Sequence, residues 1–345
     1  AAATTGPTDS ITVQLDYYLS PQFAGVASAV VNDLYAKHGI QNLNLLPTCL
    51  PGEEQGRVRQ HLNDNPSHVA VGTVEQNIFT PTLAANPHLR TTAVAAMFHH
   101  SPLCVAFLKD APSPRVIGAH EDTVELLQRL FPNDKVIASP RASKLTDLLI
   151  NGSVTGIQAY TTTEVPTIER MLRDDPALAG KKLEVTVLEG MASGSAGGGV
   201  AGGATKLGYG QMVFTGDECL SGDDDRRDVV KAFLQATFEG WEHAIRHPEL
   251  AAEQVLEAQK RLLDVNSTAD GELGDVDHWY RGSSNETQRE YDVEMTRLCN
   301  DQVKGTFQAD RYGVIDVDRW DEANRWLLGD GYKGDNYAID PAVWK

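Results

Sequence analysis

Polar and aromatic side chains that can hold a small molecule gather at the ends of predicted strands. The candidates at the ends of the strands at residues 11–17, 68–72 and 156–160 are Asp16, Tyr17, Tyr18, Gln22, Thr73, Glu75, Tyr160 and Glu164. A tyrosine stacks on a flat ring while offering a hydroxyl, and a carboxylate accepts hydrogen bonds from an amino group. Because ligands of α/β proteins bind outside the carboxyl ends of the strands, we expect these side chains to share one site. Taken singly, each tyrosine equally suits half-buried packing, and each acid equally suits solvent.

The other reactive residues indicate neither a catalytic nor a metal site. His99 and His100 are adjacent, so their side chains leave the chain in different directions, which suits packing at a hinge better than chelation. A nucleophile elbow of the G-x-S-x-G type, in its strand–turn–helix context, is also missing from the sequence. The sequence therefore predicts a protein that is not an enzyme and that uses no cofactor and no metal.

Residues 190–210 form a glycine-rich segment of low complexity, GMASGSAGGGVAGGATKLGYG. The segment fits neither the G-x-x-x-x-G-K-[ST] phosphate loop nor the strand–G-x-G-x-x-G–helix pattern of dinucleotide sites. A stretch so poor in side chains is typical of a flexible connection. We therefore expect an exposed loop there, outside the binding site.

Two acids, Glu121 and Asp122, open the helix predicted at residues 122–131. Negative side chains at this position complement the helix dipole, and they repel an approaching phosphate or sulfonate. The sequence at this helix start disfavours an anionic ligand, whereas Ser139, Arg141 and Ser143, at the start of the next predicted helix, could still accept one.

The elements that position these residues alternate between strands and helices. The first predicted elements are a strand at 11–17, a helix at 23–38, a strand at 41–46, a helix at 53–63, and strands at 68–72 and 91–97. Next come strands at 103–108, 115–118, 135–138 and 156–160 with helices at 122–131 and 142–151, then a strand at 211–215 and helices at 226–245 and 249–263. This alternation predicts an α/β protein with mostly parallel sheets.

Chain length and apolar runs predict two lobes. A chain of 345 residues exceeds one core of ordinary size. The apolar runs on either side of His99 and His100 suit a first crossing between lobes near residues 97–103, and the strand at 211–215 implies a return near 204–213. We assign residues 10–98 and 211–345 to lobe 1, with a C-terminal helical extension, and residues 99–210 to lobe 2.

Composition excludes several classes of partner. A net charge of −18 and a pI near 4.9 exclude nucleic acid as the main partner and disfavour an anionic lipid surface. No run of apolar residues approaches the roughly 18 that a spanning helix needs. Four widely spaced cysteines, Cys49, Cys104, Cys219 and Cys299, predict buried free thiols rather than bridges. Residues 1–10 lack a basic and an apolar segment, so we expect any targeting peptide to have been removed.

Three stretches occur in an order that resembles a known family. They read LDYYLSPQFAG at residues 15–25, GIQAYTTTEV at 156–165 and GYGQMVFTGDE at 208–218, the last followed by VKAFLQATFEGWEHAIRHPELAAEQVL at 230–256. Together they resemble the bacterial solute-binding family of the alkanesulfonate-binding and thiamine-pyrimidine-precursor-binding proteins, and the fungal enzyme that makes this pyrimidine. Tyr209, in the third stretch, joins the candidate ligand-binding residues.

The resemblance implies a two-lobed periplasmic binding protein fold of type II, each lobe a mixed, mostly parallel sheet flanked by helices. The family's opening Trp and His correspond to Tyr17 and Phe23, so an aromatic platform is kept while a polar contact is lost. The pyrimidine-forming enzyme consumes a histidine, holds pyridoxal phosphate on a lysine and has a cysteine-rich run near iron. This chain has no such run, and Lys37 stands at the far end of its helix from Tyr17. The sequence therefore does not support that activity.

The leading hypothesis is a solute-binding protein that captures a small aromatic or amine-bearing nutrient, similar to a thiamine pyrimidine precursor, between its lobes. It implies an ABC transporter in the membrane as partner and an extracytoplasmic location, periplasmic or lipoprotein-like. The alternative is a non-catalytic accessory subunit of a larger complex, in an organelle after removal of a targeting peptide, with the acidic segment 264–345 as docking surface. In a binder, we expect most aromatic residues of that segment to be buried against lobe 1: Trp279, Tyr280, Trp320, Trp326, Tyr332, Tyr337 and Trp344.

Overall fold

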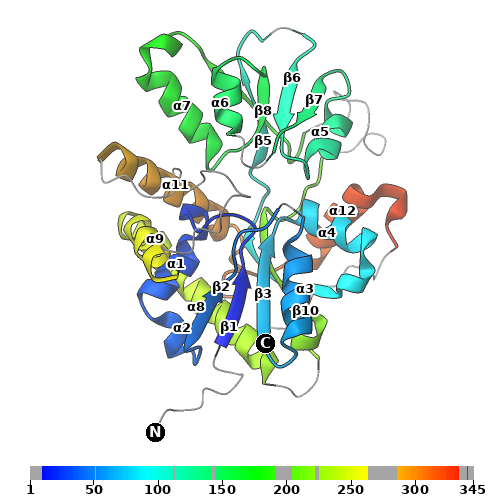
Figure 1. The fold of residues 1–345 in the computed structure, drawn as a ribbon, viewed down its shortest axis with the longest axis vertical. Helices are drawn as coiled ribbons and strands as arrows, with labels where there is room; N and C mark the ends of the chain where they lie inside the picture. The colour runs from blue at the N-terminus through cyan, green and yellow to red at the C-terminus, as the bar shows by residue number, and fades with distance from the viewer. Residues whose placement is uncertain are drawn as a thin grey trace.

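The computed structural model describes residues 10–50, 52–111, 113–140, 144–191, 204–221, 225–262, 286–333 and 340. In this part of the chain, the strands form two separate five-stranded sheets, one above the other in Figure 1. We call the lower sheet with its helices lobe 1 and the upper sheet with its helices lobe 2. Two segments connect the sheets, at residues 99–102 and between residues 188 and 210.

The sheet of lobe 1 has the strand order β2-β1-β3-β10-β4. Its strands are β1 (Ser10–Gln14), β2 (Asn42–Leu45), β3 (Val69–Val74), β4 (Thr91–Phe98) and β10 (Gln211–Gly216). Strand β1 pairs in parallel with β2 and β3, whereas β10 runs antiparallel to both β3 and β4. Every residue of β3, β4 and β10 is buried, because helices cover both faces of the sheet.

The sheet of lobe 2 has the order β7-β6-β8-β5-β9. Its strands are β5 (Leu103–Leu108), β6 (Val116–Ala119), β7 (Lys135–Ala138), β8 (Gly156–Tyr160) and β9 (Leu183–Val187). Strand β6 is parallel to β7 and β8, and β5 is antiparallel to β8 and β9. The two-lobed architecture of mixed sheets flanked by helices confirms the fold class predicted from the sequence. The residue boundaries assigned to the two lobes stay a prediction.

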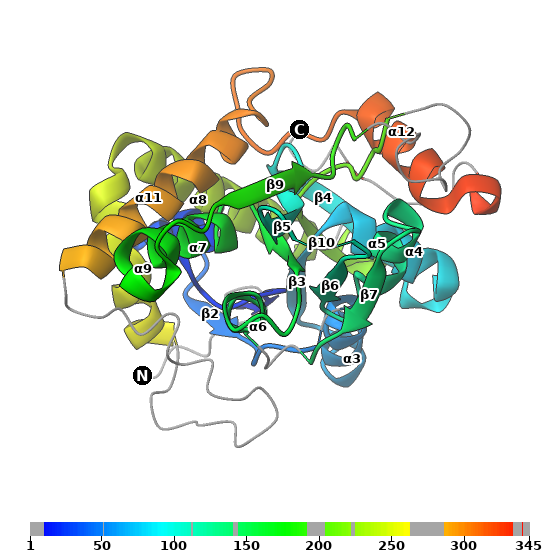
Figure 2. The same ribbon diagram turned by 90° about the horizontal axis from the view of Figure 1, so that it is seen from above.

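Helices fill the connections and extend the chain beyond the sheets (Figures 1 and 2). Those of the first part are η1 (Pro21–Phe23), α1 (Ala24–Val31), α2 (Leu34–Lys37), α3 (Glu54–Asp64), α4 (Gln76–Ala85) and η2 (Pro87–Leu89). Lobe 2 carries α5 (Val124–Leu130), α6 (Leu145–Ile150), α7 (Glu164–Asp174) and η3 (Pro176–Leu178). The last described elements are η4 (Asp217–Cys219), α8 (Arg226–Arg246), α9 (Pro248–Leu262), α11 (Glu286–Lys304), α12 (Val317–Leu328) and η5 (Gly329–Gly331).

Glycines allow α1 and α8 to pack closely on one face of the lobe 1 sheet. A Cβ atom at Gly240 would stand 2.1 Å from the carbonyl oxygen of Gly25, and a Cβ atom at Gly25 would stand 2.3 Å from the ring of Trp241. Trp241 is fully buried and meets Phe98 of β4 edge to face, with ring centroids 6.3 Å apart. The Gly-Trp pair of α8 therefore serves the core of lobe 1.

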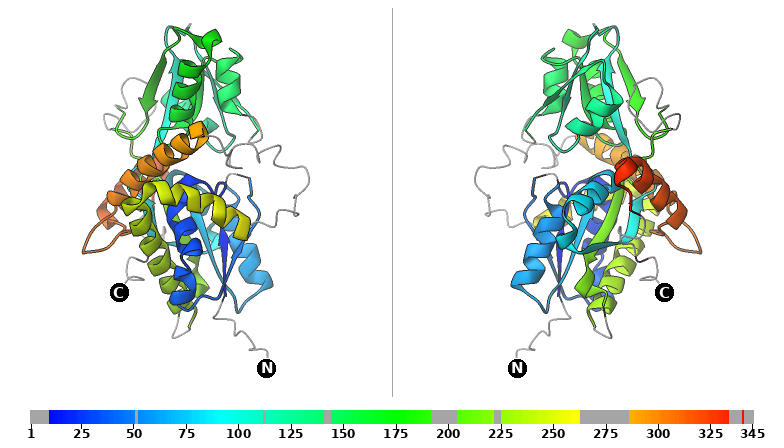
Figure 3. Two further views of the ribbon diagram at one scale, coloured as in Figure 1. Left: turned by 90° about the vertical axis from the view of Figure 1, so that its left-hand side faces the viewer. Right: turned by 90° about the vertical axis from the view of Figure 1, so that its right-hand side faces the viewer.

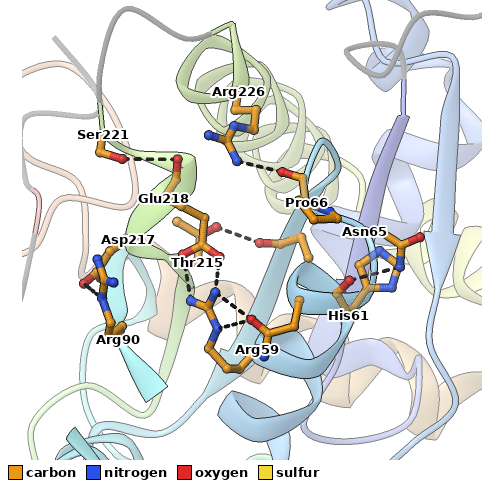
Figure 4. Close-up of polar contacts among 12 residues, drawn as sticks. Arg59, His61, Asn65, Pro66, Arg90, Thr215, Asp217, Glu218, Ser221 and Arg226 are labelled. Atoms are coloured by element: carbon orange, nitrogen blue, oxygen red, sulfur yellow. Dashed lines mark hydrogen bonds and ion pairs between the residues drawn. The ribbon is translucent and has the colours of Figure 1, made fainter. Parts of the chain in front are cut away.

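An ion pair and a hydrogen bond hold the end of lobe 1 that points away from lobe 2. Figure 4 shows Arg59 of α3 facing the carboxylate of Glu218, which follows β10, and Arg226 of α8 donating to the Pro66 carbonyl at 3.0 Å. The first contact connects α3 with the segment after β10, and the second connects the start of α8 with the α3–β3 connection. They fix the far end of β10.

Several sequence-based predictions need correction. The single helix predicted at 23–38 is divided at Asp33, whose φ of 56° lies in the left-handed region. Thr205, Leu207 and Tyr209 are buried, so the end of the glycine-rich segment is not an exposed loop; residues 192–203 lie outside the described ranges. Elements α4, α7 and β9 were not predicted.

The C-terminal aromatic residues do not all pack on lobe 1. Trp320 is 1% exposed and belongs to the lobe 1 core, but Trp326 packs against an apolar cluster of lobe 2. Tyr332 is half-buried. The remaining members of the predicted set, Trp279, Tyr280, Tyr337 and Trp344, lie outside the described residues.

Candidate ligand-binding site

The carboxyl ends of strands from both lobes face each other. Glu75 follows β3 in lobe 1, and the hydroxyl of Tyr160, at the end of β8 in lobe 2, donates a hydrogen bond to its carboxyl group. Ser101, in the first connection between the sheets, also donates to this carboxyl group at 3.5 Å. Residues that the sequence places 85 positions apart therefore meet at one point between the lobes.

A second acid, Asp16, is held by a network on the lobe 1 side. Its Oδ1 accepts hydrogen bonds from the Thr73 hydroxyl at 2.6 Å and from Nε2 of Gln211 at 2.5 Å. The backbone N–H of Asp16 donates to the Thr73 hydroxyl oxygen at 3.1 Å, and Gln22 Nε2 donates to Gln211 Oε1 at 2.9 Å. Residues from β3, η1 and β10 thus fix the carboxylate just after β1.

Burial changes the acid–base behaviour of Glu75. The side chain is only 5% exposed, and desolvation raises its pKa to about 8, with a further upward contribution from the negative charges of Asp16 and Asp122. Hydrogen bonds from Tyr160 and Ser101 act in the opposite direction but do not offset the burial. At neutral pH the carboxyl group is therefore mostly protonated and can donate as well as accept a hydrogen bond.

Tyr17 and Tyr18 lie beside Asp16 in the chain and are half-buried. Their ring centroids are 4.9 Å apart and the ring planes are inclined by 67°, an edge-to-face arrangement. Tyr17 also packs against the core of lobe 1, which holds one side of its ring. We refer to Asp16, Tyr17, Tyr18, Thr73, Glu75, Tyr160 and Gln211 together as the interlobe site.

Two other predicted residues are engaged in local contacts. Glu164 begins α7, and its carboxylate accepts hydrogen bonds from the Tyr160 backbone N–H at 3.0 Å and the Thr163 hydroxyl at 2.5 Å. Burial raises its pKa. Gln22 contacts the interlobe site through Gln211. Both residues therefore position their neighbours in this structure.

Tyr209 does not join the predicted group. Its side chain is fully buried in lobe 1, and its hydroxyl accepts a hydrogen bond from the Asp316 backbone N–H at 2.8 Å. Its backbone is paired with Gln76, whose N–H donates to the Tyr209 carbonyl at 3.0 Å. The family-like position of this tyrosine therefore has a packing role here.

Gln211 and Ser101 were not predicted from the sequence, and neither was the proximity of Asp122 to Glu75. Gln211 begins β10, and because β10 is antiparallel to β3, its start lies at the same edge of the sheet as the end of β3. The antiparallel return of the chain into the lobe 1 sheet was therefore the signal from which Gln211 could have been predicted. Ser101 lies in the predicted crossing, and Asp122 was already noted as an acid that repels anions.

The described residues include a histidine pair and four cysteines that bear on metal and thiol chemistry. Within these ranges, no group of three or more His, Cys, Asp or Glu side chains could hold a metal ion. His243 and His247, at the end of α8, form an H-x-x-x-H pair with ring centroids 5.1 Å apart, but they lack a third protein ligand in this part of the chain. All four cysteines are buried thiols, as the sequence predicted.

Comparison with known proteins identifies the fold. The chain resembles the ligand-binding component of an ABC-type import system from Staphylococcus aureus, solved with zinc bound, with a TM-score of 0.55 and 13% identity over 97% of each chain. The chain has the periplasmic binding protein fold. A Bordetella bronchiseptica RB50 protein of known structure is similar, with a TM-score of 0.53 and 12% identity over 98% of this chain and 94% of the other. No family model and no curated protein matches the sequence.

The periplasmic binding protein fold accounts for the place of the interlobe site. In open α/β sheets, ligands bind beyond the carboxyl ends of the strands, and here those ends of β1, β3 and β8 lie together. None of the described helices combines the length and apolar character that crossing a bilayer requires.

Proposed function

We propose that this chain is a solute-binding protein that captures a small amine-bearing, aromatic molecule between its two lobes for import by an ABC transporter. The observation that carries the proposal is Glu75, a buried carboxyl group that follows a lobe 1 strand and is bonded to Tyr160 of lobe 2. A ligand held at this point would contact both lobes, so its binding energy would favour their closure.

The charges around Glu75 favour a basic ligand. The ionised groups that act on it, Asp16 and Asp122, are both negative. A protonated amine would lower the pKa of Glu75 and convert the neutral acid into a paired carboxylate, whereas a sulfonate or phosphate would add a further negative charge. We therefore place alkanesulfonates behind amines as candidate solutes.

The tyrosines supply the second feature of the proposed solute. Tyr17 and Tyr18 are half-buried neighbours of Asp16, and Tyr160 brings a third ring from lobe 2. A flat heterocycle can stack on such rings while its exocyclic amine reaches the acids. An aminopyrimidine similar to a thiamine precursor meets both requirements, because a ring nitrogen can carry the proton while the exocyclic amino group donates hydrogen bonds to the acids.

A thermal-shift screen tests this proposal. Aminopyrimidines, aliphatic amines and alkanesulfonates would be added separately to the full chain, because a ligand that binds only the native state raises the melting temperature. We expect a concentration-dependent increase with aminopyrimidines and none with sulfonates. The increase in melting temperature should be lost in Glu75→Ala. It should be kept in the control Glu121→Ala, which removes an exposed acid next to Asp122 in lobe 2.

Transport implies an extracytoplasmic location and a membrane partner that binds the loaded protein reversibly and releases it after taking over the solute. Size-exclusion chromatography with light scattering after native purification examines this part of the proposal. A monomer whose melting temperature responds to solute supports a transport role. Stable co-purification in a large complex, without any response to solute, would replace it with the role of an accessory subunit.

A further inference from the structure

Helix α11 is anchored in lobe 1. Its residues Cys299 and Val303 are fully buried in the lobe 1 core, and Asn300 Nδ2 donates to the Ala244 carbonyl of α8 at 2.9 Å. Near its end, the Gln302 carbonyl accepts from the His99 N–H at 3.2 Å. The helix therefore moves with lobe 1 and touches the first connection between the sheets.

The same helix also binds lobe 2. The hydroxyl of Tyr291 donates to the Thr163 carbonyl at 3.0 Å and is hydrogen-bonded to the Thr167 hydroxyl on α7. The guanidinium of Arg170, one turn further along α7, lies 4.7 Å from the centroid of the Tyr291 ring. One side chain of α11 thus makes three contacts with the first turns of α7.

Helix α12 repeats this arrangement with different residues. Trp320 and Asn324 are buried against α4 in lobe 1, where Asn324 Oδ1 accepts from Gln76 Nε2 at 2.9 Å and from the Thr80 hydroxyl at 2.7 Å. Two turns after Trp320, Trp326 packs against the apolar cluster of lobe 2, and the guanidinium of Arg129 on α5 lies 4.4 Å from the centroid of its ring.

Helix α12 also contacts both connections between the lobes. Arg319 is hydrogen-bonded to Nδ1 of His100 at 2.9 Å and donates to the Gly208 carbonyl at 3.2 Å. Glu189, which follows β9, lies 3.8 Å from the same guanidinium. The two places where a hinge would bend are therefore joined by one arginine from outside either sheet.

The two helices lie on opposite sides of the narrow region between the lobes. Figure 1 shows α11 below α7 on the left and α12 below α5 on the right. In Figure 2, which is seen from above, α11 and α7 again lie on one side of the molecule and α12 and α5 on the other. In Figure 3 the orange helix α11 crosses the level at which the lobes meet. A rotation of lobe 2 toward either side would therefore pull it away from the helix on the other.

We propose that α11 and α12 form a two-sided C-terminal brace, made by Tyr291 on one side and Trp326 on the other, that holds the lobes at a fixed angle without a bound solute. Rocking the lobes apart requires Tyr291 to leave α7 or Trp326 to leave lobe 2. The brace adds to the direct contact between Tyr160 and Glu75. It rests on contacts outside the interlobe site and does not depend on the identity of a solute.

Distance measurements between spin labels on the two lobes test the brace. Lys37 of α2 and Asp147 of α6 are exposed, and the four native cysteines are buried, so cysteines placed at these two positions accept the labels selectively. In the otherwise unchanged protein we expect a narrow distribution of distances with no ligand added. Combining Tyr291→Ala with Trp326→Ala should give a broader distribution displaced to a different mean distance.

Matched variants separate release of the brace from loss of folding. Tyr291→Phe removes only the hydroxyl, and Arg129→Ala removes the partner of Trp326 from the lobe 2 side; each should broaden the distribution less than the double variant. Arg297→Ala and Arg325→Ala change exposed residues of the same helices and should leave it unchanged. Each variant is accepted only if its circular dichroism spectrum and cooperative melting are kept. The proposal would be overturned if the distribution of label distances stayed as narrow as in the otherwise unchanged protein in the double variant, in Tyr291→Phe and in Arg129→Ala.

Discussion

At the scale of single residues, Glu75 has the most distinctive environment in the interlobe site. The pKa of its carboxyl group is near 4.5 in the unfolded state and about 8 in the native state. Between these pH values the carboxyl group is protonated in the native state and ionised in the unfolded state. The linked stability is fully present below pH 4.5 and is lost as the pH rises toward 8. The acid therefore makes the protein less stable in mildly alkaline solution than in mildly acidic solution.

Glu75→Gln should remove this dependence. We expect the free energy of unfolding of the natural protein, relative to that of the variant, to decrease from pH 5 to pH 8 by at most about 1.4 kcal/mol per pH unit. Chemical denaturation at several pH values measures the difference. Glu121→Gln, which removes an exposed charge, is the control. A difference between Glu75→Gln and the natural protein that does not vary with pH would show that Glu75 is ionised in the native state.

Tyr17 gives a second prediction at this scale. If its ring stacks on the solute, Tyr17→Ala should weaken binding by about 1 to 3 kcal/mol, whereas Tyr17→Phe should retain most of the affinity. Titration calorimetry with a solute found by the screen compares the two variants. Because Tyr17 also packs on lobe 1, the melting temperature of each variant without solute is measured first. Equal affinity in Tyr17→Ala would place the site elsewhere.

At the scale of elements, the contact of α1 with α8 depends on Gly240. A methyl group there would meet the Gly25 carbonyl at 2.1 Å, and backbone atoms cannot move aside as a flexible side chain can. Overpacking of this kind typically costs about 1 to 3 kcal/mol, so Gly240→Ala should lower the free energy of unfolding despite the better helix propensity of alanine. Gln235→Ala, at an exposed position of the same helix, should not destabilise the protein. Urea denaturation of both variants distinguishes these outcomes.

The sequence predicted elements whose pattern is complete within a few residues. The strands at 103–108 and 156–160 coincide with β5 and β8, since both are short buried runs. Helix α4 was missed because Pro81 interrupts an otherwise helical pattern. The half-exposed edge strand β9, LEVTV, was overlooked although it alternates apolar and polar residues at the strand period. Local periodicity therefore carried the signal for β9 but was broken by the proline in α4.

The candidate site was predictable only as a set of strand ends. Asp16, Thr73, Glu75 and Tyr160 lie together because they follow or end strands, which the sequence pattern reveals. The contact of Gln211 with Asp16 joins residues 195 positions apart and depends on how the returning strand pairs. Tyr209, two residues earlier, points into the core of lobe 1. Neither fact follows from spacing along the chain.

At the scale of the whole molecule, the C-terminal helices connect what the sheets keep separate. The segment beyond residue 264 was expected to pack on lobe 1, and Trp326 and Tyr291 instead reach lobe 2. The amphipathic patterns of α11 and α12 indicated that each helix has a buried face, but they did not indicate which lobe would cover it. A helix that contacts two bodies has the same sequence pattern as a helix that contacts one.

The position of β10 has a consequence for synthesis on the ribosome. This strand lies between β3 and β4, yet it is made more than a hundred residues after them, when the strands β5 to β9 of lobe 2 have already been made. Until Gln211–Gly216 arrives, the nascent chain holds two apolar strands whose partner does not yet exist. Lobe 2, whose strands are made in between, can therefore fold first, whereas lobe 1 must wait for its interior strand β10.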